Sequence, residues 1–396
     1  MLCKVRKLST EYKGKSLDPL WVILDEQGAP PILPLLFTTH LSLYGEVSEK
    51  RRIENSYSSI KSYVFEYKPA SDSTIRSYVY CLARFLSYLE ECKNQHSTPG
   101  MHSSSSCSER FLNFYINSVL AEKANSSLTL HIHASALIAY YNWLDDNELC
   151  EEKKIKTYRK TRQHIEDHCD TKNYIQYISR SQRSNLLTAC KTISEKLMMR
   201  MGFEVGLRTS ELVGIRVDEK LSSLFAQIAD EKFNSVNLFR YLLKGKFTKG
   251  GKSRWIYFSR PLLEEMHRYY LTERATIEKK SNKKDDSFFL RTDKRFFGTG
   301  IGPEQGSRVF RKRAKNTNLN TDLSFHDLRH TFATETFHSE IKSKEGRETR
   351  SESAALIVVA QRLGHSFGRN GIAPSVTTRY IRMRMQMFEV EENLHE

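Results

Sequence analysis

Residues 324–331 read Ser-Phe-His-Asp-Leu-Arg-His-Thr, and this stretch predicts the start of a helix. Ser324 and Asp327 have the spacing of a capping box, in which two side chains satisfy free backbone N–H groups of the first turn. His326 and Arg329 then lie one turn apart on the same face. The apolar residues Phe325, Leu328 and Phe332 are expected on the buried side of this helix. Taken alone, such a start is also typical of an ordinary surface helix with a histidine–arginine pair.

Two more polar groups follow on the C-terminal side of this helix. Residues 361–365 (QRLGH) end an apolar helix at Gly364, because glycine favours the left-handed conformation of a helix C-cap. His365 then projects from the end of that helix. Farther on, a helix expected at about 375–388 follows a proline and carries Tyr380 within the sequence TTRYI.

On the N-terminal side, residues 206–212 (GLRTSEL) follow an apolar helix that extends to about residue 205. Gly206 permits a turn, and Arg208 lies in that turn just before hydroxyl side chains that can cap the next helix. Glu211 comes three residues after Arg208. By itself this is a common joint between two helices, with a solvated arginine.

A β-hairpin is expected between this joint and the helix at residue 324. The β-prone runs RYLLKGKF (240–247) and SRWIYF (253–258) flank a turn that contains Lys249 and two glycines. The stretch 218–235 looks irregular, and 339–352 looks like an exposed polar insertion. Further helices are expected at about 261–280, 304–316, 324–338 and 352–363.

The first half of the chain predicts a separate, all-helical domain at about 56–150. Apolar residues recur at three- and four-residue steps in helices expected at 73–95, 111–120 and 128–149. Residues 1–55 form an N-terminal segment to which the sequence assigns no role. Residues 151–172 are polar, basic in their first half, and read as a linker to a catalytic domain at 173–396.

Composition narrows the class of protein. The 396 residues carry a net charge of +15 with a pI near 9.3, which indicates a polyanionic partner, nucleic acid first. A membrane surface is the second choice of such a partner. No apolar run approaches the roughly 18 residues of a membrane span, so an integral membrane protein is excluded, and the final expectation includes no membrane partner. The N-terminus resembles no export signal, and we expect a cytoplasmic protein.

Neither a metal nor a cofactor is expected. The seven cysteines are scattered and form no CxxC pair, which disfavours a zinc ribbon and a disulfide framework. The glycine-rich stretch GTGIGPEQG at 298–306 lacks the lysine and hydroxyl residue that end a phosphate-binding loop. It reads as a plain loop.

The order and spacing of these groups resemble the tyrosine recombinase (phage integrase) family. The resemblance covers about 180–388 with specific motifs, and 56–150 only through the number of helices. It implies a mainly α protein with a small antiparallel β-sheet, in which a helical core-binding domain precedes an α+β catalytic domain. It implies nothing about residues 1–55.

The resemblance also implies a role for each motif residue. Arg208 and Arg329 would clamp the scissile phosphate, and Lys249 would be a mobile lysine that protonates the leaving oxygen. His326 and His365 would be the two active-site histidines. Tyr380 would be the nucleophile. Glu211 would hold the first arginine, Arg208, in place without contacting the phosphate itself.

The chemistry of strand exchange needs these residue types. A tyrosine can store the energy of a phosphodiester in a covalent intermediate, but its free hydroxyl has a pKa near 10 and needs help to lose its proton. The transition state gathers negative charge on the non-bridging oxygens. Two planar guanidiniums can hold these oxygens in a bidentate manner, and no metal is required.

The expected function is therefore site-specific recombination of a mobile genetic element through a 3′-phosphotyrosine intermediate. The expected partner is double-stranded DNA with specific sites, bound by four copies of the chain on two sites. An accessory DNA-bending protein is a further candidate partner, and the expected location is the bacterial nucleoid. The methionine-rich segment after Tyr380 (RMRMQMFEV) would contact a neighbouring subunit or fold back on its own domain.

Three alternatives remain from the sequence. A type IB topoisomerase has similar nucleophile and phosphate chemistry but needs no paired sites. A catalytically inactive DNA-binding protein would have no use for Tyr380 or Lys249. An RNA-binding protein would carry interleaved aromatic stacking motifs, which are not found.

Overall fold

The computed structural model describes residues 2–53, 62–95, 103–168, 176–317, 319–320, 322–342, 350–365 and 387. These residues form two compact units, residues 1–172 (unit 1) and 173–396 (unit 2). The fold is mainly helical with small antiparallel sheets of two strands each, as the sequence predicted. Among the described helices, none combines the length and apolar character needed to cross a membrane.

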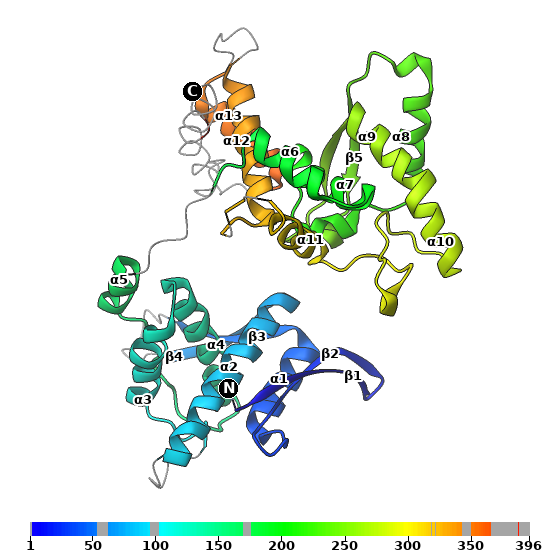
Figure 1. Cartoon of the computed structure of the whole chain (residues 1–396). Helices are drawn as coiled ribbons and strands as arrows, with labels where there is room; N and C mark the ends of the chain where they lie inside the picture. Colours follow the sequence, from blue (N-terminus) through cyan, green and yellow to red (C-terminus); the bar gives the residue numbers. More distant parts are fainter. Residues whose placement is uncertain are drawn as a thin grey trace. The chain divides into compact units, whose positions relative to one another are not determined.

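Unit 1 is a helical core flanked by two hairpins (Figure 1). The N-terminal hairpin and the helix after it are β1 (Lys4–Tyr12), β2 (Lys15–Leu24) and α1 (Ile32–Tyr44). A second hairpin and the helices follow: β3 (Glu46–Ile53), β4 (Ser62–Pro69), α2 (Asp72–Gln95), α3 (Glu109–Phe114), α4 (Ser127–Asp146) and α5 (Arg159–His168). The expected helices at 73–95 and 128–149 are confirmed by α2 and α4. The helix expected at 111–120 begins as α3 and continues as a π-helical turn, Tyr115–Val119.

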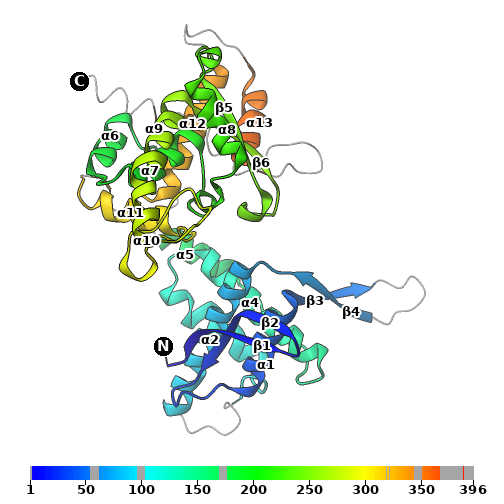
Figure 2. The same ribbon diagram turned by 90° about the vertical axis from the view of Figure 1, so that its right-hand side faces the viewer.

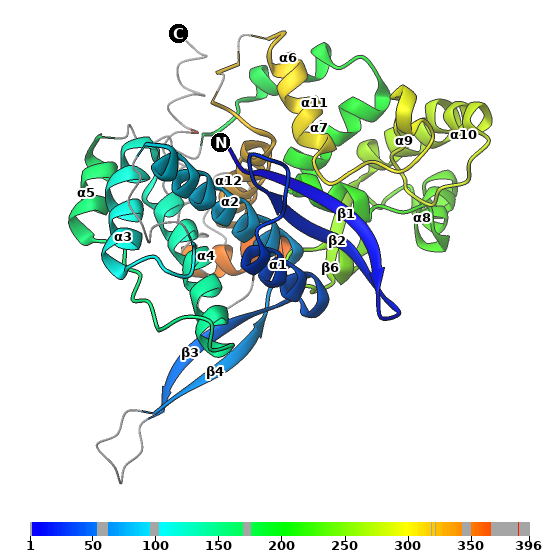
Figure 3. The same cartoon turned by 90° about the horizontal axis from the view of Figure 1, so that it is seen from below.

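The N-terminal segment contributes to the core of unit 1. Cys3, Ile23, Phe37 and Leu41 are buried with the apolar stripe of α2 and with α4. Helix α1 packs beside strand β2 and contacts α2, and Figure 3 shows it between the N-terminal hairpin and the other helices. This packing could not be predicted, because each of these apolar runs is too short to indicate its partner.

The sequence boundaries of unit 1 need two corrections. Strand β4 lies within the region expected to be all helical, and with β3 it forms a hairpin that extends away from the helices (Figure 2). The stretch 151–172, expected to be a linker, contains helix α5 and buries Ile155 and Ile165 in the core. Two isolated isoleucines give no apolar periodicity, which is why the sequence did not reveal their burial.

Unit 2 surrounds a hairpin with helices. Its elements are α6 (Arg180–Ala189), α7 (Ile193–Val205), α8 (Glu219–Ala229), β5 (Leu238–Leu243), β6 (Arg254–Ser259), α9 (Arg260–Tyr269), α10 (Ala275–Ser281), α11 (Gln305–Ala314), α12 (Phe325–Ile341) and α13 (Glu352–Leu363). Helices α7 and α12 lie side by side. Their apolar faces meet in the main core, and α13 packs against the other side of α12.

Three expectations for unit 2 are corrected. The stretch 218–235, expected to be irregular, contains helix α8, capped by Asp218 and held by buried Leu221, Leu224 and Phe225. Helix α12 extends to Ile341, whose side chain is buried, so residues 339–341 belong to this helix and not to the polar insertion expected at 339–352. The hairpin is present, but ten residues separate its strands instead of a tight turn.

The C-terminal helix expected at 375–388 lies outside the described residues, apart from Met387. The Met387 side chain is buried against Phe332 and Phe337 of α12 and against α13. Of the two outcomes left open for the methionine-rich segment, this residue shows packing against its own unit.

Candidate active site

The joint after α7 holds Arg208 in place. Gly206 ends α7 in the left-handed conformation at φ 72°, where L side chains are rarely found, and the chain turns there. The next residues form a 3-10 turn, Thr209–Gly214, instead of the expected capped helix. Glu211 in that turn folds back: its Oε2 accepts the backbone N–H of Arg208 at 2.8 Å, and its Oε1 accepts Nη1 of the same arginine at 2.8 Å.

Helix α12 presents the second arginine. The predicted capping box is confirmed, since the Asp327 carboxylate accepts the backbone N–H of Ser324 at 2.8 Å. Arg329, 1% exposed, donates from Nη1 to the Gly206 carbonyl and to Glu211 Oε2, and from Nη2 to the Leu363 carbonyl at 2.6 Å. Arg329 thereby connects α12 to the end of α7 and to the end of α13.

A third arginine, which the sequence analysis missed, completes the cluster. Arg254 at the start of β6 donates from Nη2 to Glu211 Oε2 at 2.7 Å. The alternation of β6 turns Arg254 inward with Ile256 and Phe258. An arginine at an inward position of an otherwise apolar strand face was the available signal, because such a charge needs a buried partner.

Glu211 is therefore a fully buried carboxylate shared by three guanidiniums. Burial alone would raise the pKa of Glu211, but the positive charges, Arg254 first and then Arg329, hold it below its ordinary value. Glu211 stays ionised, and its single negative charge leaves the three arginines with an excess of two positive charges.

Two histidines lie within the field of these arginines. Burial lowers the pKa of His365 to about 4, and the charges of Arg329 and Arg208 act in the same direction. Burial and the charge of Arg329 also lower the pKa of His326, whose ring meets that of His330 edge to face at 4.4 Å between centroids. Both imidazoles are neutral near pH 7 and can accept a proton or a hydrogen bond.

The structure thus gathers five of the seven residues expected in the site: Arg208, Glu211, His326, Arg329 and His365. Lys249 lies exposed in the connection between β5 and β6, followed by Gly250 and Gly251, both at positive φ. Tyr380 lies outside the described residues.

Known proteins are similar to this chain in sequence and in fold. A model of the phage integrase family matches residues 176–345, which include Arg208, Glu211, Lys249, His326 and Arg329. Residues 176–345 therefore form a domain of the phage integrase family. Among curated relatives, tyrosine recombinase XerA of Pyrococcus horikoshii is 23% identical over 337 residues, covering 83% of this chain and 92% of that protein. The XerA of Pyrococcus furiosus is 24% identical over 331 residues, with the same coverage.

The fold of the chain is similar to that of a solved structure. The site-specific recombinase XerH, bound to its difH substrate in a pre-cleavage complex, superposes with a TM-score of 0.51 at 17% identity. The superposition covers 79% of this chain and 78% of XerH.

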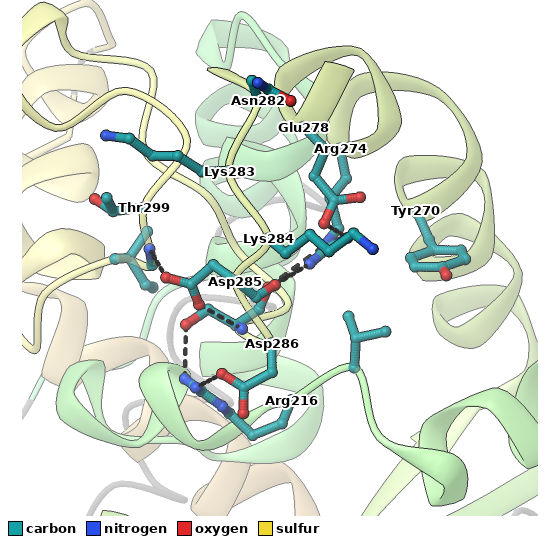
Figure 4. Close-up of a pocket in the computed structure, with 14 residues that line it drawn as sticks. Arg216, Tyr270, Arg274, Glu278, Asn282, Lys283, Lys284, Asp285, Asp286 and Thr299 are labelled. Carbon is teal, nitrogen blue, oxygen red and sulfur yellow. Dashed lines mark hydrogen bonds and ion pairs between the residues drawn. The ribbon is translucent and has the colours of Figure 1, made fainter. Parts of the chain in front are cut away.

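A separate cavity of about 1200 Å³ in unit 2 lies between α10 and the loop that follows it (Figure 4). Its arginines are engaged within the fold. Arg274 pairs with Glu278 at 2.8 Å and donates to the Asp285 carbonyl at 2.7 Å, while Arg216 pairs with Asp286. These arginines fix the loop, and the cavity is distinct from the cluster around Glu211.

Proposed function

We propose that this recombinase cleaves and rejoins DNA strands at specific sites through a 3′-phosphotyrosine intermediate formed on Tyr380, and that it moves a mobile genetic element. The observation that carries the proposal is the cluster of three arginines around one buried carboxylate, with two neutral histidines beside it. A phosphodiester carries one negative charge, and the cluster has an excess of positive charge to receive it.

Arg208 is the arginine best placed to contact the phosphate directly. Its side chain is 22% exposed, whereas those of Arg254 and Arg329 are almost entirely buried. We therefore assign to Arg208 the contact with a non-bridging oxygen. Buried Arg329 adds positive charge near the phosphate without contacting it. It also holds the backbone at the ends of α7 and α13 through the Gly206 and Leu363 carbonyls.

The reaction then follows from the chemistry of the remaining residues. The Tyr380 hydroxyl attacks phosphorus, the bond to the 5′ oxygen breaks, and a phosphotyrosine bond takes its place. Neutral His326 accepts the tyrosine proton, and Lys249 donates a proton to the departing 5′ oxygen. Attack by the 5′ hydroxyl of another strand reverses these steps and completes the exchange.

The same proposal assigns DNA binding to both units, with 56–150 of unit 1 as the core-binding part, and four copies of the chain acting on two duplex sites. Its support is the net charge of +15 and the family relationship. Because phosphate contacts release counterions, the affinity for duplex DNA should fall steeply with added salt.

A trapping experiment tests the function. Duplexes of randomised sequence that each carry a nick are incubated with the protein, because loss of the fragment beyond the nick prevents rejoining and traps a covalent adduct. We expect an adduct stable to denaturation with the wild-type chain and with Tyr158→Phe, an exposed tyrosine of unit 1 as control. Tyr380→Phe should form none while still binding DNA. Adducts formed by Tyr380→Phe would assign the nucleophile elsewhere, and DNA binding without any wild-type adduct would indicate a binding protein.

A further inference from the structure

Arg254 belongs to the hairpin that carries Lys249 and donates hydrogen bonds to two other parts of the candidate active site. It begins β6, five residues after Lys249, and its side chain is 7% exposed. One end of its guanidinium, Nη2, donates to Glu211 Oε2 at 2.7 Å. The other end, Nη1, donates to the backbone carbonyl of Arg362 in the last turn of α13.

The end of α13 depends on two guanidiniums. Helix C-termini leave backbone carbonyls without partners within the helix. Here the carbonyls of Arg362 and Leu363 accept from Arg254 and Arg329, respectively. Gly364 follows at φ 67°, and His365 comes next. The position of His365 is thereby tied to both arginines.

Gly364 also packs directly on Arg254. A Cβ atom at Gly364 would lie 2.4 Å from the Arg254 Cδ atom, too close for the side chain to stay where it is. The Leu-Gly-His sequence therefore needs glycine for two reasons, the left-handed backbone and the approach of this arginine.

We propose that Arg254 is a positioning residue, whose forked guanidinium holds Glu211 and the end of α13 in register so that Arg208 and His365 face the same phosphate. This inference rests on the proposed function. Through the short chain segment between the two residues, the same clamp anchors the hairpin connection that carries Lys249. A lysine could keep the charge but not both hydrogen bonds, because its single ammonium lacks the planar fork.

Apart from Arg329, the other described buried arginines of unit 2 have no such link. Arg313 pairs with Glu195 on α7, donating from Nε at 2.8 Å, and Arg274 holds carbonyls of the loop after α10. Neither arginine donates a described hydrogen bond to Glu211 or to the end of α13. The geometry thus separates Arg254 from arginines that serve only the fold.

The test compares Arg254→Lys with Arg240→Lys, the same exchange at an exposed position of strand β5. Single-turnover adduct formation is measured on a nicked duplex recovered with the wild-type chain, and affinity is measured on the same duplex without its nick. We expect Arg254→Lys to slow cleavage by about tenfold or more, since small misplacements of reacting groups are costly. Its affinity should stay within about twofold of the wild-type value, a margin far below the cost of a lost phosphate contact. Arg240→Lys should cleave at the wild-type rate.

Two further measurements distinguish positioning from a loss of folding. Gly364→Ala keeps every charge, but its methyl group would displace the Arg254 side chain. It should therefore slow cleavage as Arg254→Lys does. Proton NMR of His365, assigned with His365→Asn, should show a raised pKa in Arg254→Gln, because a nearby positive charge is lost, and little change in Arg254→Lys.

The outcomes separate the two proposals. If the wild-type chain forms no adduct, the proposed function is wrong and the role of Arg254 falls with it. If the wild-type chain forms adducts and Arg254→Lys forms them equally fast, the fork is not needed and only the inference about Arg254 is overturned. A His365 pKa that is unchanged in Arg254→Gln would also contradict the contact on which the inference depends.

Discussion

Units 1 and 2 differ in what they bury. Among the described residues, the buried polar side chains of unit 1 are short or neutral: Thr38, Ser48, Ser87, Ser104 and His133. Unit 2 buries one carboxylate and several guanidiniums: Arg183, Glu211, Arg254, Arg274, Arg313 and Arg329. Both units also have extensive apolar cores.

The difference shows where function constrains the fold. Removing a charge from water costs several kcal/mol, and a buried ion pair often stabilises a protein no better than apolar residues of the same volume. Unit 1 is held by aromatic packing, such as Phe37 against Tyr140 and Phe85 against Tyr115. Three of the buried charges of unit 2, Glu211, Arg254 and Arg329, lie together where the proposed reaction needs a fixed positive field.

The largest expected effect comes from Glu211→Gln. Three guanidiniums would lose the carboxylate that they share, and breaking a buried pair in this way costs about 3–5 kcal/mol of unfolding free energy. Urea unfolding followed by Trp255 fluorescence, in a background with Trp21 and Trp143 replaced by phenylalanine, reports on unit 2 alone. A loss below about 1 kcal/mol would mean that the carboxylate is not the centre of the cluster.

A second pair of variants separates catalysis from folding within unit 2. Arg208→Ala should slow adduct formation by about 10²–10³-fold, as for loss of one donor to a developing oxyanion, and cost little stability because the side chain is partly exposed. Arg313→Met should lower stability but leave adduct formation nearly unchanged, since it removes the partner of Glu195 and no described hydrogen bond of Arg313 reaches Glu211. Adduct formation per folded molecule measures the first effect, and urea unfolding measures the second. Equal effects of both variants on adduct formation would mean that Arg208 has no more direct role in cleavage than Arg313.

Acid should weaken both units mainly through one histidine each, with smaller contributions from His40 and His326, whose pKa values burial also lowers. The pKa of His133 in unit 1 and of His365 in unit 2 is lowered to about 4 from an ordinary 6.5, burial being the main cause. Between these values the unfolded chain binds more protons than the folded one, so stability is full above about pH 6.5 and falls towards pH 4. With both groups partly screened by solvent, we expect about 1–2 kcal/mol from each.

Urea unfolding at pH 7 and pH 5 checks this pH dependence. His133→Asn should reduce the difference in unfolding free energy between the two pH values for unit 1 only. His365→Asn should reduce it for unit 2 only. The same loss of stability in the double variant as in the wild-type chain would assign the titration to other groups.

The smallest effect is expected from Tyr140→Phe in unit 1. The buried Tyr140 hydroxyl shares a hydrogen bond of 2.7 Å with the Ser104 hydroxyl, and the loss of one neutral hydrogen bond costs about 1 kcal/mol. Unfolding of unit 1, followed by the fluorescence of Trp21 and Trp143 in a Trp255→Phe background, gives the value. A cost as large as that of Glu211→Gln would contradict the contrast between the two units.

Most of the helices could be predicted from the sequence, and some of the contacts could not. The capping box at Ser324 and the C-cap at Gly364 were predictable because each involves hydrogen bonds between residues a few positions apart. Helix α8 was missed although Leu221, Leu224 and Phe225 have helical spacing, since the polar residues around them obscure the pattern. The packing of residues 1–53 was not predictable, because a short apolar run fits many partners.

The order of the motif residues was enough to suggest the family and to name Arg208, Glu211, His326, Arg329 and His365 as one site. Local chemistry also determined how each is presented, through a left-handed glycine or a capped helix start. Only the tertiary structure decided that Arg254 joins them, because Glu211 is 43 residues before Arg254 and 118 before Arg329. Hydrogen bonds between neighbours in sequence form with the turn itself, whereas a carboxylate shared across such distances exists only when the core has packed around it.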